Sequence, residues 1–143
     1  TFVVAGQPYT LDGIEKQQLV PMKDPRIHVA LNCASKGCPL LQARAFSGAS
    51  LQAQLDAASR AWVQGSAVVV EEQTGRVQLS TILDWYSGEF VPGAGESVPG
   101  VADRLQGVIE FVARHAGSEQ AAVLRAGNYP VGFLPFDWSV NAQ

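Results

Sequence analysis

The sequence predicts an α+β fold: a single domain over residues 1–143, in which a small, mostly antiparallel sheet packs against helices. Two pairs of strand-like segments are each joined by a short glycine-containing turn, as in antiparallel hairpins. Other segments repeat apolar residues at helical spacing. Strands and helices do not alternate regularly, which disfavours a doubly wound parallel sheet. With 47% hydrophobic and 16% charged residues, the chain suits one globular domain that buries its own core.

The N-terminal residues predict a hairpin followed by a short helix. Residues 2–4 and 7–10 are the two strands of the hairpin. Thr10 is a favourable N-cap for a helix over residues 11–19, because its hydroxyl can accept a hydrogen bond from a backbone amide of the first turn. Pro21 then ends the helix, since proline has no backbone N–H to donate.

The next segment, residues 26–31, predicts an inner strand. Alternating side chains on a strand point to opposite faces, so Ile27, Val29 and Leu31 share one face. Three large apolar side chains identify that face as core. His28 then points the other way, toward a second layer or a cleft.

The middle of the chain predicts a longer helix and a second hairpin. Ser47 is a candidate N-cap for the helix, and Gly65 is a candidate stop. Between them, apolar residues recur with 4-3-4 spacing and define the buried face: Leu51, Leu55, Ala58 and Trp62. Residues 67–71 and 76–79 then form the hairpin.

The C-terminal half predicts three more helices and a last strand. A short helix begins at Ser80 or Thr81, and a connector rich in proline and glycine follows over residues 91–100. The buried face of the next helix consists of Val101, Leu105, Val108, Ile109 and Val112. A helix near residues 118–125 and a strand with a tail over residues 129–141 complete the chain.

Composition excludes several classes of function. A net charge of −3, with scattered lysines and arginines, leaves no basic surface for nucleic acid. No apolar run approaches the roughly 20 residues that cross a membrane. The sequence has no glycine-rich phosphate loop, GxSxG elbow or HExxH helix, so no cofactor is predicted. Thr1 is not an initiator methionine and the chain begins on a strand, so it looks processed or cut.

Two cysteines with four residues between them allow three interpretations. A Cys33–Cys38 disulfide needs the two Cα atoms within about 7 Å, which a turn can supply, and an oxidising compartment. A free Cys33 thiol at the end of the predicted strand is a candidate nucleophile. A zinc site is disfavoured, because His28 and His115 lie on unrelated elements and four ligands would have to converge. No metal is predicted.

A catalytic set is the sharper interpretation of the same residues. Cys33 would be the nucleophile, His28 the base, and Asp137 the acid that orients the imidazole. The plainer interpretations are a structural histidine and an aspartate that bonds backbone amides in the turn after Pro135. His115, in the last turn of its helix, is interpreted as interacting with the helix dipole.

The acids that flank Trp85-Tyr86 receive a structural interpretation. Asp84 and Glu89 are five residues apart, so they do not share a helical face. They are interpreted as a capping or hydrogen-bonding pair.

Four segments carry a resemblance to a known family: YTLDGIE, DPRIHVALNCASKGCPLL, ILDWYSGEF and LPFDWSVN. In this order they resemble the bacterial and plant family named domain of unknown function 547, through essentially all 143 residues. Its bacterial members are often exported, which implies a periplasmic or other extracytoplasmic location and favours the Cys33–Cys38 disulfide. Members usually carry a preceding helical segment with an Asn-Ala-Tyr-Asn motif. The resemblance therefore implies that this chain is the C-terminal part of a longer family domain.

The resemblance also implies a distant relation to papain-like and transglutaminase-like folds. There, a cysteine at a helix start pairs with a histidine on a following strand, and His28 would match that histidine. Cys33 follows His28 in this chain instead of preceding it, so the order departs from that pattern.

Two functions from different classes follow. The first is a non-catalytic, exported binding or assembly module that recognises a protein partner or a small ligand, with a loop closed by Cys33 and Cys38. The second is a cysteine-dependent hydrolase or acyl transferase that uses Cys33 and His28. The state of the two thiols discriminates between them.

Overall fold

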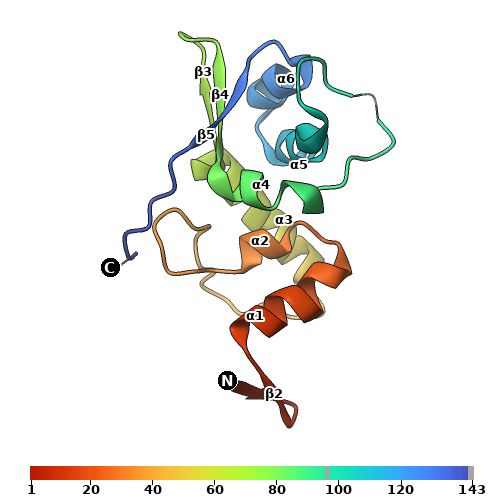
Figure 1. Ribbon diagram of the computed structural model, residues 1–143, viewed down its shortest axis with the longest axis vertical. Coiled ribbons are helices and arrows are strands. Elements are labelled where there is room, and N and C mark those ends of the chain that lie inside the picture. Colours follow the sequence, from red (N-terminus) through yellow and green to blue (C-terminus); the bar gives the residue numbers. More distant parts are fainter. Residues whose placement is uncertain (96, 142–143) are drawn as a thin grey trace.

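The computed structural model describes residues 1–95 and 97–141, and it confirms the α+β class, with helices and two small sheets (Figure 1). The strands are β1 (Phe2–Val4), β2 (Gln7–Tyr9), β3 (Val68–Glu71), β4 (Arg76–Ser80) and β5 (Val131–Leu134). The α-helices are α1 (Leu11–Gly13), α2 (Ile27–Ala30), α3 (Leu51–Trp62), α4 (Thr81–Trp85), α5 (Gln106–His115) and α6 (Ser118–Ala126). Wider π turns extend α1 over Ile14–Leu19 and α3 over Val63–Ala67, and 3-10 turns span Val20–Met22, Ser87–Glu89 and Asp103–Leu105.

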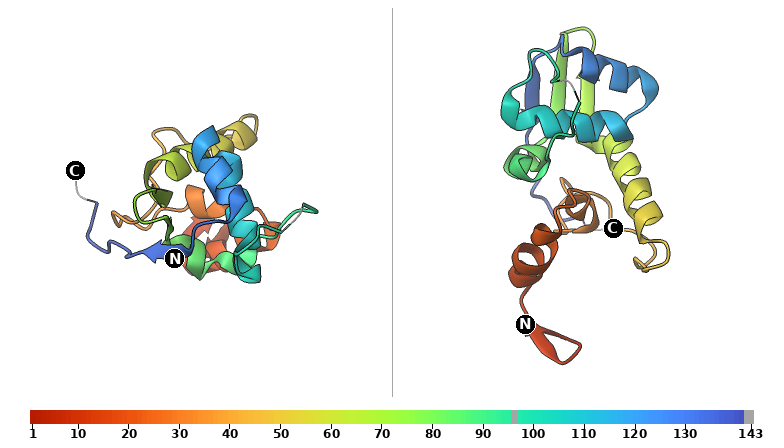
Figure 2. Two further views of the ribbon diagram at one scale, coloured as in Figure 1. Left: turned by 90° about the horizontal axis from the view of Figure 1, so that it is seen from above. Right: turned by 90° about the vertical axis from the view of Figure 1, so that its right-hand side faces the viewer.

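The main sheet has three strands in the order β3-β4-β5. β3 and β4 form the predicted antiparallel hairpin, whereas β5 pairs with β4 in parallel, with Phe133 opposite Leu79. The sheet is therefore mixed. Helices α5 and α6 lie over one face of it (Figure 2). The core fills the space between these layers, and Leu79, Leu83, Val108 and Val112 have no exposed surface.

The N-terminal hairpin β1-β2 projects from the opposite end of the molecule (Figure 2). Its strands pair antiparallel as predicted, with Phe2 opposite Tyr9. The Thr10 hydroxyl accepts a hydrogen bond from the Gly13 amide at 3.0 Å, so the predicted N-cap of α1 is confirmed. Capping thus determines where the exposed hairpin ends and the helix begins.

A one-turn helix replaces the strand predicted over residues 26–31, so that prediction was wrong. α2 begins after Pro25. The Asp24 carboxylate accepts a hydrogen bond from the Arg26 amide at 3.0 Å, which is an Asx turn. Proline holds φ near the helical value, so this Asp-Pro-Arg turn starts a helical conformation.

The failed strand prediction rested on alternation, which α2 does not obey. Ile27, His28 and Val29 are consecutive and all buried, because other elements cover this turn on all sides. Leu31 is only half-buried. The burial of Ile27 and Val29 is as predicted, although the faces assigned to them were not.

Arg26 anchors α2 to α3. Its guanidinium donates to Asp24 at 2.6 Å and, across the chain, to Asp56 at 2.7 Å. The hydrogen bonds from Arg26 hold the pKa of Asp24 below its usual value. These contacts fix α2, and therefore His28, against the long helix.

The longer helix begins later than predicted. Ser47 does not cap it; α3 starts after Ser50, and the Gln54 side chain accepts from the Ser47 amide at 2.9 Å. The predicted buried face is correct at Leu55, Ala58 and Trp62, which are 7%, 2% and 5% exposed, whereas Leu51 is only half-buried. The Ser47 and Ser50 hydroxyls bond each other, and the Ser50 hydroxyl donates to Gln54, so neither hydroxyl caps the first turn of α3.

The remaining helices lie near their predicted positions, although α5 begins only at Gln106, so Val101 precedes it and is half-buried. The Ser80 hydroxyl accepts from the Ile82 amide at the start of α4. α5 ends at His115, and α6 begins at Ser118. The predicted connector over residues 91–100 is described except at residue 96, which lies outside the described residues. The Gln106 side chain holds it by accepting from the Val98 amide at 2.8 Å.

A candidate ligand-binding cleft

The loop over residues 33–38, here called the cysteine loop, is closed by a Cys33–Cys38 disulfide with the Cα atoms 6.3 Å apart. The Cys33 amide also donates to the Cys38 sulfur at 3.3 Å. The Asn32 side chain closes the loop a second time, since it accepts from the Ala34 amide at 2.8 Å and donates to the Pro39 carbonyl at 2.7 Å. Both cysteines of the chain are therefore bridged, and the loop has a defined shape.

The C-terminal segment, residues 135–141, runs from β5 back to the cysteine loop (Figure 1). The Lys36 amide donates to the Ser139 carbonyl at 2.9 Å, and the Gly37 amide donates to the Asp137 carbonyl at 3.0 Å. The Asn141 amide donates to Ala34 at 2.8 Å. This short antiparallel pairing holds the C-terminal segment against the cysteine loop.

Gly37 is required by this docking. A Cβ atom at position 37 would lie 2.8 Å from the Phe136 ring, closer than side chains approach. The missing side chain therefore lets the loop lie directly on Phe136, which becomes part of the wall beside it.

A cleft of about 400 Å³ opens between these parts. It is lined by five segments of the chain: residues from α1 and its extension, α2 with the residues after it, the cysteine loop with Pro39, α4 with Tyr86, and the C-terminal segment. Most of its lining side chains are apolar or aromatic. A preformed concave site of this size, with a few converging polar groups, is typical of small-molecule binding sites.

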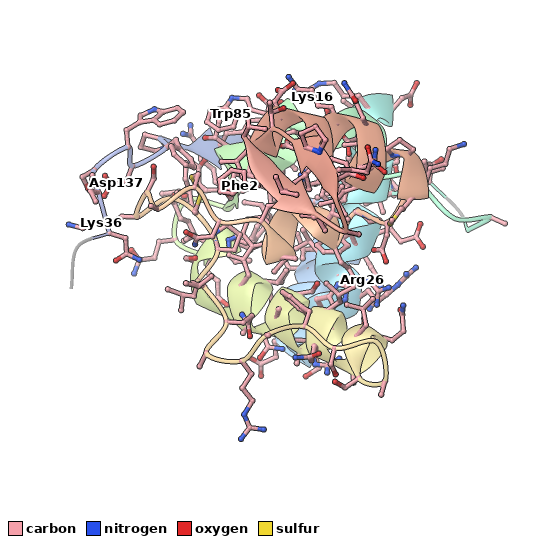
Figure 3. The ribbon with its side chains drawn as sticks, turned by 90° about the horizontal axis from the view of Figure 1, so that it is seen from below. Phe2, Lys16, Arg26, Lys36, Trp85 and Asp137 are labelled. Carbon is pink, nitrogen blue, oxygen red and sulfur yellow. A yellow bond between two sulfur atoms is a disulfide. The ribbon has the colours of Figure 1, made fainter. Side chains whose placement is uncertain are left out.

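Three aromatic rings form one wall of the cleft. The ring centroids lie 5.0 Å apart for Trp85 and Phe136, 5.7 Å for Trp85 and Trp138, and 4.5 Å for Phe136 and Trp138. Trp85 is 49% exposed and Trp138 is 69% exposed. Figure 3 shows Trp85 at the surface. Two exposed tryptophans at the mouth of a cleft indicate a contact surface, since indole rings are otherwise mostly covered.

The imidazole of His28 lies in the deeper wall. Its side chain is 2% exposed, and its Nε2 lies 2.9 Å from Oε2 of Glu89. The ring stacks on Tyr86 with centroids 4.0 Å apart. A neutral imidazole beside the carboxylate gives the pair a net charge of −1, and an imidazolium beside the carboxylate gives a net charge of zero. In neither state is the pair positive.

The carboxylate of Glu15 lines the cleft from the extension of α1. The Tyr86 hydroxyl donates to Oε1 of Glu15 at 3.1 Å. Burial raises the pKa of Tyr86, and the Glu15 carboxylate raises it further. The phenol therefore stays protonated and holds Glu15 at a fixed place in the wall.

The structure brings some of the sequence-predicted residues together and leaves others apart. His28 and Cys33 line the same cleft. Asp137 does not line it; its carboxylate is exposed and accepts from the Ser139 amide at 2.9 Å and from the Ser139 hydroxyl. These hydrogen bonds hold the pKa of Asp137 below its usual value. Figure 3 shows Asp137 beside Lys36 at the outer edge of the molecule.

Sequence reasoning missed Glu89, which contacts His28 instead of pairing with Asp84. Asp84 bonds the guanidinium of Arg104. The two acids thus have different partners, and their interpretation as a pair was wrong. A partner 61 positions away leaves no local signal in the sequence.

His115 lies in the last turn of α5 as predicted, but it is buried. Its Nδ1 donates to the Phe111 carbonyl at 2.8 Å, and burial lowers the pKa of the imidazole. Over residues 1–95 and 97–141, no cluster of three or more His, Cys, Asp or Glu side chains could hold a metal ion. In the same part of the chain, no helix has both the length and the apolar character needed to cross a membrane.

Residues 1–63 match a family described as "Protein of unknown function, DUF547", which confirms the predicted family over that part of the chain. The match covers the N-terminal hairpin, α2 and the cysteine loop, and it ends within the extension of α3. No curated protein and no solved structure matches the chain.

Proposed function

We propose that this chain, whose residues 1–63 match DUF547, is a single-domain binding module that acts outside the cytoplasm and takes a ligand into the cleft. The observation that carries the proposal is the preformed, largely apolar cleft whose rim is closed by a disulfide. A disulfide persists in oxidising compartments, which supports an extracytoplasmic location. Its two sulfurs are bonded to each other, so neither is a thiolate nucleophile.

The shape of the cleft supports binding by a preorganised wall. The Cys33–Cys38 disulfide, Asn32 and the C-terminal segment all restrain the loop before any ligand arrives. A wall that is already ordered loses little conformational entropy on binding. The module would therefore recognise a small ligand, or one side chain of a protein partner, without a large rearrangement.

An uncharged fluorescent probe tests this function. N-phenyl-1-naphthylamine brightens in apolar surroundings, and we expect saturable binding to the wild-type protein. Trp138→Ala removes an exposed ring from the cleft wall and should weaken binding about tenfold. Val69→Ala is the matched control, because Val69 is a 41% exposed apolar side chain on β3. Absence of binding, or equal weakening by both variants, would contradict the proposal.

A cysteine-dependent hydrolase or acyl transferase is the second candidate. The observation in its favour is that His28, held by Glu89, lines the same cleft as Cys33. In this version Glu89 takes the orienting role first assigned to Asp137, and Cys33 acts only after reduction. The Cys33 thiol would pass its proton to His28, and the resulting thiolate would attack an acyl carbon. The bond to the leaving group would then break as His28 returns the proton to it, and water or a second acceptor would release the acyl group from Cys33.

Counting thiols separates the two candidates. The protein is unfolded without reductant and treated with a reagent that gives a coloured product with free thiols. If the disulfide-closed binding module is the native form, no free thiol should be detected. Two reactive thiols, with Cys33 alkylated much faster than Cys38 by iodoacetamide near neutral pH, would favour the enzyme.

A further inference from the structure

We infer that the cleft recognises an organic cation, specifically a quaternary ammonium group. This inference rests on the proposed binding function and names the chemistry of its ligand. It follows from two properties that coincide in the cleft: a lining with several aromatic rings, and a carboxylate without a lysine or arginine beside it among the described residues of the lining.

The aromatic rings that line the cleft belong to two separate groups. In the first, Trp85 and Trp138 stack and Phe136 packs against both at an angle; in the second, Tyr86 stacks on His28. Both groups of rings line the same cleft. The face of an aromatic ring is the negative part of its quadrupole, so rings around a cavity attract a cation that has shed its water. A quaternary ammonium group suits such walls because its methyl groups are apolar and it donates no hydrogen bonds.

The charge of the lining is negative. Glu15 contributes a lining carboxylate that Tyr86 holds in place, and Glu89 lies behind His28 without lining the cleft itself. Among the described residues that line the cleft, none is lysine or arginine. The neighbouring Lys16 is 67% exposed and pairs with Asp12 at 2.6 Å. An anionic ligand would meet repulsion here, whereas a cation would find its countercharge.

A metal cation does not fit the same observations. Metal ions need several oxygen, nitrogen or sulfur ligands around one point, and no such group of three is present in residues 1–95 and 97–141. A cleft of about 400 Å³ with mostly apolar walls suits a larger, weakly hydrated cation instead.

Choline and its uncharged isostere, 3,3-dimethyl-1-butanol, provide the test. The two have nearly the same shape, and only choline is charged. Titrated at constant ionic strength, choline should shift the indole N–H resonances of Trp85 and Trp138 and leave that of the buried Trp62 in place. The isostere should bind about tenfold more weakly, because only the charged choline can attract the aromatic ring faces and the carboxylate.

A pair of charge-removing variants sharpens the test. Glu15→Gln keeps an acceptor for the Tyr86 hydroxyl but removes the charge, and it should weaken choline binding about fivefold or more while leaving the isostere unchanged. Glu72→Gln removes the same charge from the exposed β3–β4 turn and should change neither affinity. Equal affinities for choline and its isostere, or a Glu15→Gln protein that binds choline as well as the wild type, would overturn the inference.

The outcomes for the ligand and for the proposed function are distinguishable. If N-phenyl-1-naphthylamine binds in the cleft and choline does not, the inference of a quaternary ammonium ligand is wrong and the proposed binding function stands. If neither binds, both are wrong.

A quaternary ammonium group occurs in free amines and in the choline headgroup of lipids, and vesicles separate these sources. Cosedimentation with phosphatidylcholine but not phosphatidylglycerol vesicles, lost in Glu15→Gln, would assign the group to a lipid. Choline binding without cosedimentation would assign it to a free amine. If the protein cosediments with both kinds of vesicle, and Glu15→Gln does not change this, the result would count against the cleft as a quaternary ammonium site.

Discussion

Nε2 of His28 lies 2.9 Å from Oε2 of Glu89, and this contact joins α2 to the 3-10 turn after α4 across 61 positions of sequence. His28 belongs to the segment that matches DUF547, and Glu89 lies outside it. The deeper wall of the cleft therefore depends on both parts of the chain, whereas the aromatic wall of Trp85, Phe136 and Trp138 comes entirely from residues outside the match.

Removal of the Glu89 carboxylate should destabilise the protein. Glu89→Ala leaves the buried His28 imidazole without this partner, and we expect a loss of about 1–3 kcal/mol in the free energy of unfolding. Urea denaturation measures it. Glu72→Ala is the control on an exposed turn and should change stability by less than about 0.5 kcal/mol. Equal effects would show that the His28–Glu89 contact contributes nothing.

The disulfide should stabilise the fold modestly, because the loop it closes is short. Cys33→Ser and Cys38→Ser should each cost roughly 2 kcal/mol, and by equal amounts, since either change breaks the same bridge. Mass spectrometry of the unreduced protein should give a mass about 2 Da below the dithiol form, for two hydrogens lost. A much larger effect at Cys33 in a reduced protein would favour the nucleophile.

Gly37→Ala should disturb the docking of the cysteine loop. The added methyl group would lie 2.8 Å from the Phe136 ring, so the loop or the C-terminal segment must move, at a cost of about 1–3 kcal/mol. Gly48→Ala is the matched control, because a Cβ there meets nothing within 4 Å. Thermal unfolding and the fluorescence of the exposed tryptophans would report the difference. If the two variants behave alike, the close approach to Phe136 does not matter.

Val29 should be as important to the core as its burial indicates. Val29→Ala removes two methyl groups from a side chain that is 3% exposed and should cost about 1–3 kcal/mol. Val69→Ala on the exposed surface of β3 is the control, and chemical denaturation is the measurement. A change within error at Val29 would place α2 outside the cooperative core.

Stability should fall in mild acid partly because of His115. Burial lowers the pKa of this imidazole in the folded protein from 6.5, so the unfolded chain takes up a proton more readily. The neutral histidine therefore contributes stability above pH 6.5, and this contribution is lost as the pH falls from there through the lowered pKa. His115→Asn keeps a donor for the Phe111 carbonyl but does not titrate. Denaturation at pH 7.5 and pH 5, as sample conditions about one unit or more either side of that value, should show a shallower loss for the variant. Parallel profiles would contradict this role.

Several features were predictable because they depend on near neighbours in the chain. The Thr10 cap, the hairpin turns and the buried stripe of α3 are all determined within a few residues. The strand prediction for the α2 segment was wrong because it used only this local pattern. Three consecutive buried residues have no period, so alternation could not distinguish a strand from a helical turn.

The sequence by itself determined the α+β class, most element positions and the family of residues 1–63. It also pointed to the cysteine loop and His28. Only the tertiary structure decided that β5 runs parallel to β4, that Glu89 reaches His28, and that residues 135–141 return to the loop. The physical reason is the range of the interactions. Caps and turns act between adjacent residues, whereas the cleft is held by contacts between distant segments, which form only when the whole chain packs.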